Sequence, residues 1–202
     1  MDETGRKVDV IEKRNVFQGY HRVDAYRLRH SLYRGGIGAE IHREVIDRGQ
    51  AILVVPYDPV RDEIVLIEQF RMGPFVRGDQ PWSLEVVAGM VDDGETLEDV
   101  VRREAREEAD IELSHITHVM DCYTSPGILS ERISIFCACT DATRANGIHG
   151  LAAEGEDIKV IVMAFDEVIA AMADGRITAA PAIVGIQWLA LNRDAVRQHW
   201  SA

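Results

Sequence analysis

Two glutamates, Glu104 and Glu108, lie one helical turn apart in the segment Gly89–Ile111 and are the residues best suited to do chemistry. The part after Thr96 predicts a helix, because Thr96 and Asp99 have the spacing of a capping box and apolar residues then recur at helical spacing. With Leu97 at zero on a helical wheel, the apolar residues centre near about 15°, Glu104 falls at about −20° and Glu108 at about +20°. Those apolar residues are Leu97, Val100, Val101 and Ala105. Both carboxylates are therefore expected to face the core.

Buried carboxylates need a compensating charge, because an unpaired one costs several kcal/mol or becomes protonated. The arginines of the same helix, Arg102, Arg103 and Arg106, fall on its other side, so we expect them not to neutralise both acids. Mg²⁺ is usually held by one or two carboxylates together with substrate phosphates. Gly89 and Gly94 allow a tight loop whose backbone approaches such a site. A solvated charged helix is the alternative, and the wheel disfavours it because the arginine side is the solvated one.

The pattern of Gly89, Glu95, the run Arg103–Glu108 and Ile111 resembles the Nudix box. That family hydrolyses nucleoside diphosphates linked to another moiety and uses Mg²⁺ or Mn²⁺. One position departs from the box, since Asp110 stands where the family has a glycine in the turn leaving the helix. Aspartate tolerates the left-handed conformation better than most residues. We therefore expect a modest effect on stability and retained chemistry.

Composition bounds the remaining possibilities. A chain of 202 residues with 47% apolar residues builds one core, or a core with a small attachment. No apolar run approaches the roughly 18 residues of a membrane span, and the N-terminus lacks the apolar stretch of a signal peptide. Three cysteines without metal-site spacing, Cys122, Cys137 and Cys139, predict reduced thiols in a cytoplasmic protein. A net charge of −12 disfavours nucleic acid as a partner, although bound metal ions allow a small phosphate substrate.

Residues 1–46 are expected to form a small N-terminal β-sheet and residues 47–202 the main domain. Alternating runs at Val23–Tyr33 and Glu40–Ile46 predict an antiparallel pair rich in arginine. These arginines either solubilise an edge sheet or meet substrate phosphate. Such a small sheet is marginal by itself, so it must pack on the rest or on another subunit.

The main domain reads as an α+β fold, with several strands, a few helices and no repeated βαβ unit. The resemblance implies a Nudix α/β/α sandwich with a mixed β-sheet. Predicted strands are Ala51–Pro56, Glu63–Glu68, Ser83–Ala88, His115–Tyr123, Arg132–Thr140 and Asp157–Phe165, and predicted closing helices are Asp166–Ala173 and Ala182–Trp200.

Two loops point to one branch of the family. Thr124-Ser125-Pro126-Gly127 is by itself an ordinary turn, but Pro126 follows Ile111 at the spacing that marks the ADP-ribose pyrophosphatase branch. The segment Gly147–Asp157 is by itself an exposed acidic loop. A loop of this kind can also carry a general base that closes over substrate. The resemblance assigns the base to Glu154 and a metal-linked role to Glu156, and their closeness leaves the reverse order open.

The resemblance implies further roles. Glu104, Glu108, Glu156 and the Ala88 carbonyl would hold two or three Mg²⁺ or Mn²⁺ ions, with Glu154, Glu108 and Glu104 as catalytic residues. Supporting roles fall to Glu95, Arg103 and Glu107, with Arg103 pairing with Glu95. Met90 alone would be read as a core residue, but here it joins the positions expected to contact substrate. These positions are Arg71, Met90, Ser125, Pro126, Gly127, Glu131, Tyr20, His21, Arg43, Glu44 and Arg48.

The expected reaction is metal-dependent hydrolysis of the pyrophosphate bond of ADP-ribose, a small-molecule nucleotide, to AMP and ribose 5-phosphate. The resemblance also implies a homodimer in which the N-terminal sheet reaches the partner's site. Hydrolysis of GDP-mannose or another nucleotide sugar is the alternative within the enzyme class. A non-catalytic ligand-sensing Nudix domain is the alternative outside it, and the presence of Glu104, Glu107 and Glu108 disfavours that alternative.

Overall fold

The computed structural model describes residues 5–200, which fall into two compact units. The small unit comprises the described residues up to Gly49 together with Tyr123–Arg132. The large unit comprises Gln50–Cys122 and the described residues from Ile133 onward. The loop 123–132 thus belongs with the N-terminal sheet, whereas the sequence placed it in the main domain after residue 46.

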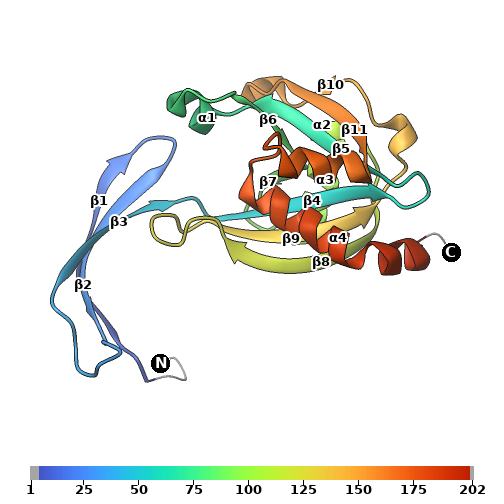
Figure 1. Ribbon diagram of the computed structural model, residues 1–202. Coiled ribbons are helices and arrows are strands. Elements are labelled where there is room, and N and C mark those ends of the chain that lie inside the picture. The colour runs from blue at the N-terminus through green and yellow to red at the C-terminus, as the bar shows by residue number, and fades with distance from the viewer. Residues whose placement is uncertain (1–4, 201–202) are drawn as a thin grey trace. The chain divides into compact units, whose positions relative to one another are not determined.

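The small unit is built on an antiparallel sheet of order β1-β2-β3 (Figure 1). Its strands are β1 Val8–Gln18, β2 Arg22–His30 and β3 Ile41–Asp47. The predicted antiparallel pair is confirmed as β2 and β3, but β1 was not predicted. Strand β1 mixes charged and apolar residues without regular alternation, and its pairing with β2 shifts register twice. Every residue of β1 is exposed, and the lack of regular alternation is why the sequence did not predict this strand.

The large unit contains an eight-stranded sheet of order β10-β11-β5-β4-β9-β8, with β6 paired to β5 and β7 paired to β4. The strands are β4 Gln50–Asp58, β5 Glu63–Phe70, β6 Trp82–Glu85, β7 Ala88–Met90, β8 Ser114–Tyr123, β9 Arg132–Cys139, β10 Ile148–His149 and β11 Ile158–Ala164. Five of the six predicted strands of the main domain are present as single strands, the sixth is divided between β6 and β7, and the predicted α+β class is confirmed.

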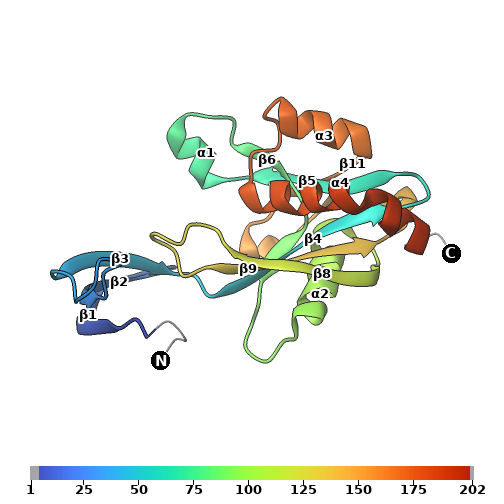
Figure 2. The ribbon, with the colours of Figure 1, turned by 60° about the horizontal axis from the view of Figure 1, so that its bottom comes forward.

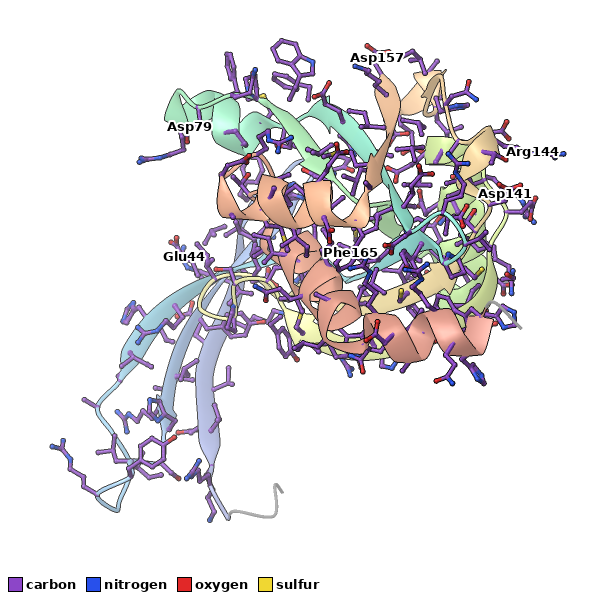
Figure 3. The ribbon with its side chains drawn as sticks, turned by 45° about the vertical axis from the view of Figure 1, so that its right-hand side comes forward. Glu44, Asp79, Asp141, Arg144, Asp157 and Phe165 are labelled. Atoms are coloured by element: carbon purple, nitrogen blue, oxygen red, sulfur yellow. The ribbon has the colours of Figure 1, made fainter. Side chains whose placement is uncertain are left out.

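Helices cover both faces of this sheet. Helix α2 (Leu97–Ala109) packs on one face, whereas α3 (Phe165–Ala173) and α4 (Ala180–Trp200) pack on the other (Figure 2). Phe165, labelled in Figure 3, begins α3 and sets its ring edge-on to that of buried Tyr57, with centroids 6.5 Å apart. The implied α/β/α sandwich is therefore confirmed. In the described residues, no helix is long and apolar enough to cross a membrane.

One predicted strand, Ser83–Ala88, is divided in the structure. Strand β6 pairs with β5 and β7 pairs with β4, so the chain changes partner at Val86 and Val87, which are fully buried. The sequence could not show this break because no glycine or proline interrupts the run Ser83–Ala88. Strand β5 ends at Phe70 and is followed by the short helix α1 (Met72–Arg77), which was not predicted. The 3-10 turns η1 (Ala142–Arg144) and η2 (Ala152–Glu154) were not predicted either.

Candidate active site

Helix α2 brings both predicted glutamates into the core. Its first turn is capped by Thr96, whose side chain accepts a hydrogen bond from the Asp99 N–H. Asp110 ends the helix with φ 51° and ψ 42°, the left-handed conformation expected at this position. Between these ends, Glu104 is 9% exposed and Glu108 is 2% exposed. The burial predicted from the helical wheel is confirmed.

Arg103 neutralises one of the two buried acids, Glu104, although its Cα lies on the other side of the helix, so the expectation that the arginines of α2 do not neutralise both acids is met. Its Nη1 lies 2.8 Å from Oε1 of Glu104 and 3.1 Å from Oε2 of Glu107. Its Nε donates to Oε1 of Glu95 at 3.0 Å, which confirms the predicted pairing with Glu95. The wheel places the Cα of Arg103 on the other side of the helix, but the long side chain folds back over the turn.

Glu108 has a different environment. Its Oε2 accepts a hydrogen bond from the Ala88 N–H at 3.0 Å, and within the described part of the chain it has no ion-pair partner. Burial raises the pKa of Glu104 to about 7 and that of Glu108 to about 8, and the charge of Glu156 raises both further. The two acids also repel each other, because burial strengthens the interaction between like charges. The pair therefore favours a bound proton or cation.

The donor set fits a hard divalent cation. Mg²⁺ and Mn²⁺ prefer oxygen ligands, and two buried carboxylates stand here with a third, Glu156, close enough to influence both. The backbone N–H of Ala88 lies within hydrogen-bonding distance of Glu108. Among the residues described, no three acidic, histidine or cysteine side chains already converge on one point as a complete metal site. Ion binding would therefore require side-chain adjustment of Glu104 or Glu108.

The backbone of Gly89 comes very close to the carboxylate of Glu104. A Cβ atom built on Gly89 would lie only 1.7 Å from Oε1 and 2.0 Å from Cδ of Glu104. Any side chain at this position would therefore displace the carboxylate. The physical reason for the glycine is space for Glu104, since its φ is not in the left-handed region.

We expect Gly89→Ala to lower kcat/KM by about a hundredfold, because a carboxylate shifted by about 1 Å no longer holds the reacting groups in register. Steady-state kinetics measure this effect. Gly73→Ala is the matched control, because a Cβ at Gly73 meets nothing within 4 Å and its φ is unstrained. Wild-type kinetics in Gly89→Ala would contradict the assigned role of the glycine.

Arg71 and Glu85 extend the polar cluster from the end of β5 to β6. The Arg71 Nη2 donates to Oε2 of Glu85 at 2.8 Å. Burial lowers the pKa of Arg71, but the carboxylates of Glu85, Glu108 and Glu156 outweigh burial and raise it above its ordinary value. Glu85 was not predicted as a site residue. It lies opposite Ile67 in the β5–β6 register, which puts it on the α2 face, and only that register could have identified it.

Two predicted residues of the acidic loop have different surroundings. The loop is tied to α2 because the Gly150 N–H donates to the Glu107 carbonyl at 3.0 Å. Glu156 is partly buried and accepts the Leu151 N–H at 3.0 Å, and Asp157, labelled in Figure 3, leads the chain into β11. Glu154 lies exposed on η2. The structure therefore brings Glu156, rather than Glu154, close to the buried acids.

The small unit gathers several of the other predicted residues. Arg48 is at their centre, with its Nε 3.1 Å from Oε1 of Glu131 and its Nη1 3.3 Å from Nε2 of His21. The second carboxylate oxygen of Glu131 accepts the Thr124 hydroxyl at 2.8 Å. Tyr20 sets its ring edge-on to His21, with centroids 4.8 Å apart.

A cavity of about 760 Å³ opens on the same small unit. Arg43 and Glu44 of β3 line it together with Gly127 of the loop 123–132 (Glu44 is labelled in Figure 3). Ser125 and Pro126 precede Gly127, and the Ser125 carbonyl accepts the N–H groups of Ile128 and Leu129 at 3.0 and 2.9 Å. The predicted residues of the small unit therefore form two groups, one around Arg48 and one at or next to this cavity.

Comparison with known proteins agrees with this geometry. The NUDIX domain family model matches residues 47–183. The chain is 43% identical over 194 residues to an ADP-ribose pyrophosphatase of Escherichia coli K12, covering 96% of this chain and 93% of the relative. It is 38% identical over 196 residues to an ADP-ribose pyrophosphatase of Haemophilus influenzae, covering 96% and 90%. It is also 33% identical over 181 residues to a GDP-mannose pyrophosphatase of Pectobacterium atrosepticum, covering 89% and 92%.

A solved structure described as an ADP compounds hydrolase superposes with a TM-score of 0.71, covering 97% of each chain at 18% identity, which shows a shared fold. The box on α2, the sandwich around it and the match over residues 47–183 lead to one conclusion: the chain belongs to the Nudix family.

Proposed function

We propose that this protein is a metal-dependent hydrolase that cleaves the pyrophosphate bond of ADP-ribose, giving AMP and ribose 5-phosphate. The observation that carries the proposal is the buried pair Glu104 and Glu108 beside Gly89. It occurs in a chain that matches proteins named ADP-ribose pyrophosphatase over almost its whole length. A buried acid pair without a function would only destabilise the fold.

Glu104, Glu108, Glu156 and the Ala88 carbonyl would hold Mg²⁺ or Mn²⁺, with two or three ions in the site. Such ions, when bound, neutralise charge on the phosphoryl oxygens and lower the pKa of a coordinated water. Arg103 keeps Glu104 and Glu107 in place by binding both carboxylates together with Glu95. We assign it and its partners this supporting role.

Glu154 is proposed to take the proton from the attacking water, and Glu156 to complete the metal site. This assignment agrees with their surroundings, because Glu156 already influences Glu104 and Glu108 whereas Glu154 is exposed. The turn η2 that carries Glu154 lies between Gly150 and Gly155, both with positive φ. A small movement of this turn over bound substrate would bring the base to the reacting water.

Glutamine replacements separate the two roles. We expect Glu154→Gln to lower kcat by about a hundredfold, because the general base is lost, while the Mg²⁺-dependent rise in melting temperature stays as in the wild type. Glu156→Gln should reduce that Mg²⁺-dependent rise. Single-turnover kinetics and thermal melts across Mg²⁺ concentrations make both measurements. If instead Glu154→Gln reduces the Mg²⁺-dependent rise and Glu156→Gln lowers only kcat, the two assignments are exchanged. Full activity in both variants would remove this loop from the mechanism.

Substrate contacts are proposed for Arg71 and Met90 in the large unit. In the small unit they are proposed for Tyr20, His21, Arg43, Glu44, Arg48, Ser125, Pro126, Gly127 and Glu131. Arg71 is a guanidinium surrounded by carboxylates, and a guanidinium is well suited to bind phosphate oxygens in a bidentate manner. The cavity at Arg43 and Glu44 offers both a donor and an acceptor to a sugar or a base.

We further propose a homodimer in which the N-terminal sheet is covered by the partner subunit. Strand β1 is exposed along its length, including Val8 at 66%, Val10 at 52% and Phe17 at 58%. A three-stranded sheet gains stability when an apolar face is covered. Sedimentation equilibrium should give twice the chain mass of 22.6 kDa, and a monomer at micromolar concentration would contradict this proposal.

The cysteines Cys122, Cys137 and Cys139 are free thiols, which supports a cytoplasmic location.

A panel of ADP-ribose, GDP-mannose, NADH and ADP-glucose, incubated with Mg²⁺ and analysed by mass spectrometry, tests the reaction. We expect AMP and ribose 5-phosphate from ADP-ribose at the highest kcat/KM. Preference for GDP-mannose would favour the alternative suggested by the 33% identical relative. Binding without turnover of any member would favour a ligand-sensing domain.

A further inference from the structure

Gln69 is a buried side chain that the mechanism above does not use. It lies on β5 and is 7% exposed. Its Nε2 atom is buried and has no hydrogen-bond partner among the described residues. An amide that gives up water without a replacement hydrogen bond costs about 1–3 kcal/mol, so an unpaired buried amide needs an explanation.

The strand places Gln69 on the face that carries the acid pair. Val65 and Ile67 belong to the core cluster under α2, whereas Ile64 and Leu66 belong to the cluster on the other face. Side chains alternate along a strand, so Gln69, two residues after Ile67, shares the α2 face. Arg71, two residues further, reaches Glu85, and its charge is stabilised by Glu108 and Glu156. Gln69 therefore lies between the apolar core and the polar end of the site.

The chemistry of the unpaired atom limits what can satisfy it. An amide NH₂ group is a hydrogen-bond donor and cannot ligate a cation, so metal ions held by Glu104 and Glu108 would leave it unpaired. Arg71, two residues further along the chain, pairs with Glu85 through two nitrogens and is itself only a donor, so it cannot accept a hydrogen bond from this amide. A ligand entering here must therefore bring an acceptor oxygen, and a phosphoryl oxygen held beside the acid pair is an acceptor of the right kind.

We propose that Gln69 contacts the substrate, its side-chain amide donating a hydrogen bond to a phosphoryl oxygen of the bound pyrophosphate. This inference rests on the proposed function, because it requires a diphosphate substrate at the acid pair. It assigns Gln69 to ground-state binding, since a neutral donor adds affinity for the phosphoryl group and has no proton to transfer in the reaction.

Gln69→Met tests the inference because methionine keeps the length of the side chain and removes the donor. We expect KM for ADP-ribose to rise by about tenfold to a hundredfold, with kcat within about threefold of the wild type. The Kd of the α,β-methylene analogue of ADP-ribose should rise by the same factor. The melting temperature without ligand should stay equal or rise, because an unsatisfied polar group has been removed.

Gln50→Met is the matched control. The Gln50 amide donates to the Ser134 hydroxyl at 3.2 Å, so its loss should lower the melting temperature and leave KM unchanged. Gln69→Leu repeats the test with a different shape. In the wild-type protein, a glutamine side-chain amide signal should move downfield when the analogue binds to ¹⁵N-labelled protein, and this readout needs no variant.

Three results overturn the inference: a kcat/KM within threefold of the wild type in Gln69→Met, a loss of melting temperature like that of Gln50→Met with an unchanged Kd, or an unmoved amide signal. Failure of the proposed function looks different, because the wild-type protein itself would then bind no analogue. That result would overturn both proposals together.

Discussion

Replacing Glu108 with glutamine is expected to lower kcat for ADP-ribose by at least about a thousandfold in saturating Mg²⁺. Metal ions contribute several kcal/mol to such a reaction, and each 1.4 kcal/mol corresponds to about tenfold in rate. Glu108 is the more deeply buried member of the acid pair, at 2% exposure, so no solvent-exposed group can take its place. Single-turnover assays with ADP-ribose measure the loss.

The fold should survive this substitution, so the lost activity reports on the site. Glutamine has the shape of glutamate, and its carbonyl oxygen can still accept the Ala88 N–H that Oε2 of Glu108 accepts. Glu98→Gln is the matched control, because Glu98 lies exposed in the first turn of the same helix. Turnover by Glu108→Gln at the wild-type rate would remove Glu108 from the mechanism.

The buried acid pair of the site, Glu104 and Glu108, could be predicted from the sequence because the pattern that places it involves only residues close together in the chain. The cap at Thr96 and the apolar stripe of α2 are set by residues within four positions of one another, and this local pattern is enough to predict that Glu104 and Glu108 face the core. The same locality explains the confirmed left-handed conformation of Asp110. Helical periodicity therefore determined which face of α2 carries the chemistry.

The sequence could not predict the position of a side chain that depends on how two strands pair, or on how far a long side chain extends from its Cα. Glu85 and Gln69 lie on strands that are apolar on both faces, so periodicity does not say which face each one occupies. Their positions follow from the antiparallel pairing of β5 with β6, a contact between distant residues. Arg103 was placed by its Cα alone, yet its guanidinium reaches across the helix to Glu104.

The loop 123–132 shows the same limit on a larger scale. It joins the small unit through hydrogen bonds such as that from the Ile46 N–H to the Ile128 carbonyl and that from the Ser130 hydroxyl to Asp47, both far apart in sequence. A prediction that divides the chain once, after residue 46, cannot represent a unit made of two segments. The sequence shows the turn pattern of Ser125, Pro126 and Gly127, but it does not show that this loop packs against residues of the N-terminal sheet.

The second large effect concerns stability without metal. Both Glu104 and Glu108 have a pKa raised in the folded protein, to about 7 and about 8, so the folded state binds protons more strongly than the unfolded chain. Their contribution to stability is fully present below the ordinary value of about 4.5 and is lost as pH rises through about 7 to 8. We expect the free energy of unfolding in EDTA to fall between pH 5 and pH 9, as measured by urea denaturation.

Glu108→Gln should remove most of this pH dependence and be more stable than the wild type by roughly 2–4 kcal/mol above pH 8, with little difference at pH 5. With Mg²⁺ present, the wild type should become more stable than Glu108→Gln, because ion binding stabilises only a site that keeps its carboxylates. This effect should be larger at high pH, where protons no longer compete with the ion. Glu98→Gln should follow the wild type throughout. A wild-type protein whose stability in EDTA is flat across this range, and whose melting temperature ignores millimolar Mg²⁺, would show that the two buried acids do not form a cation site.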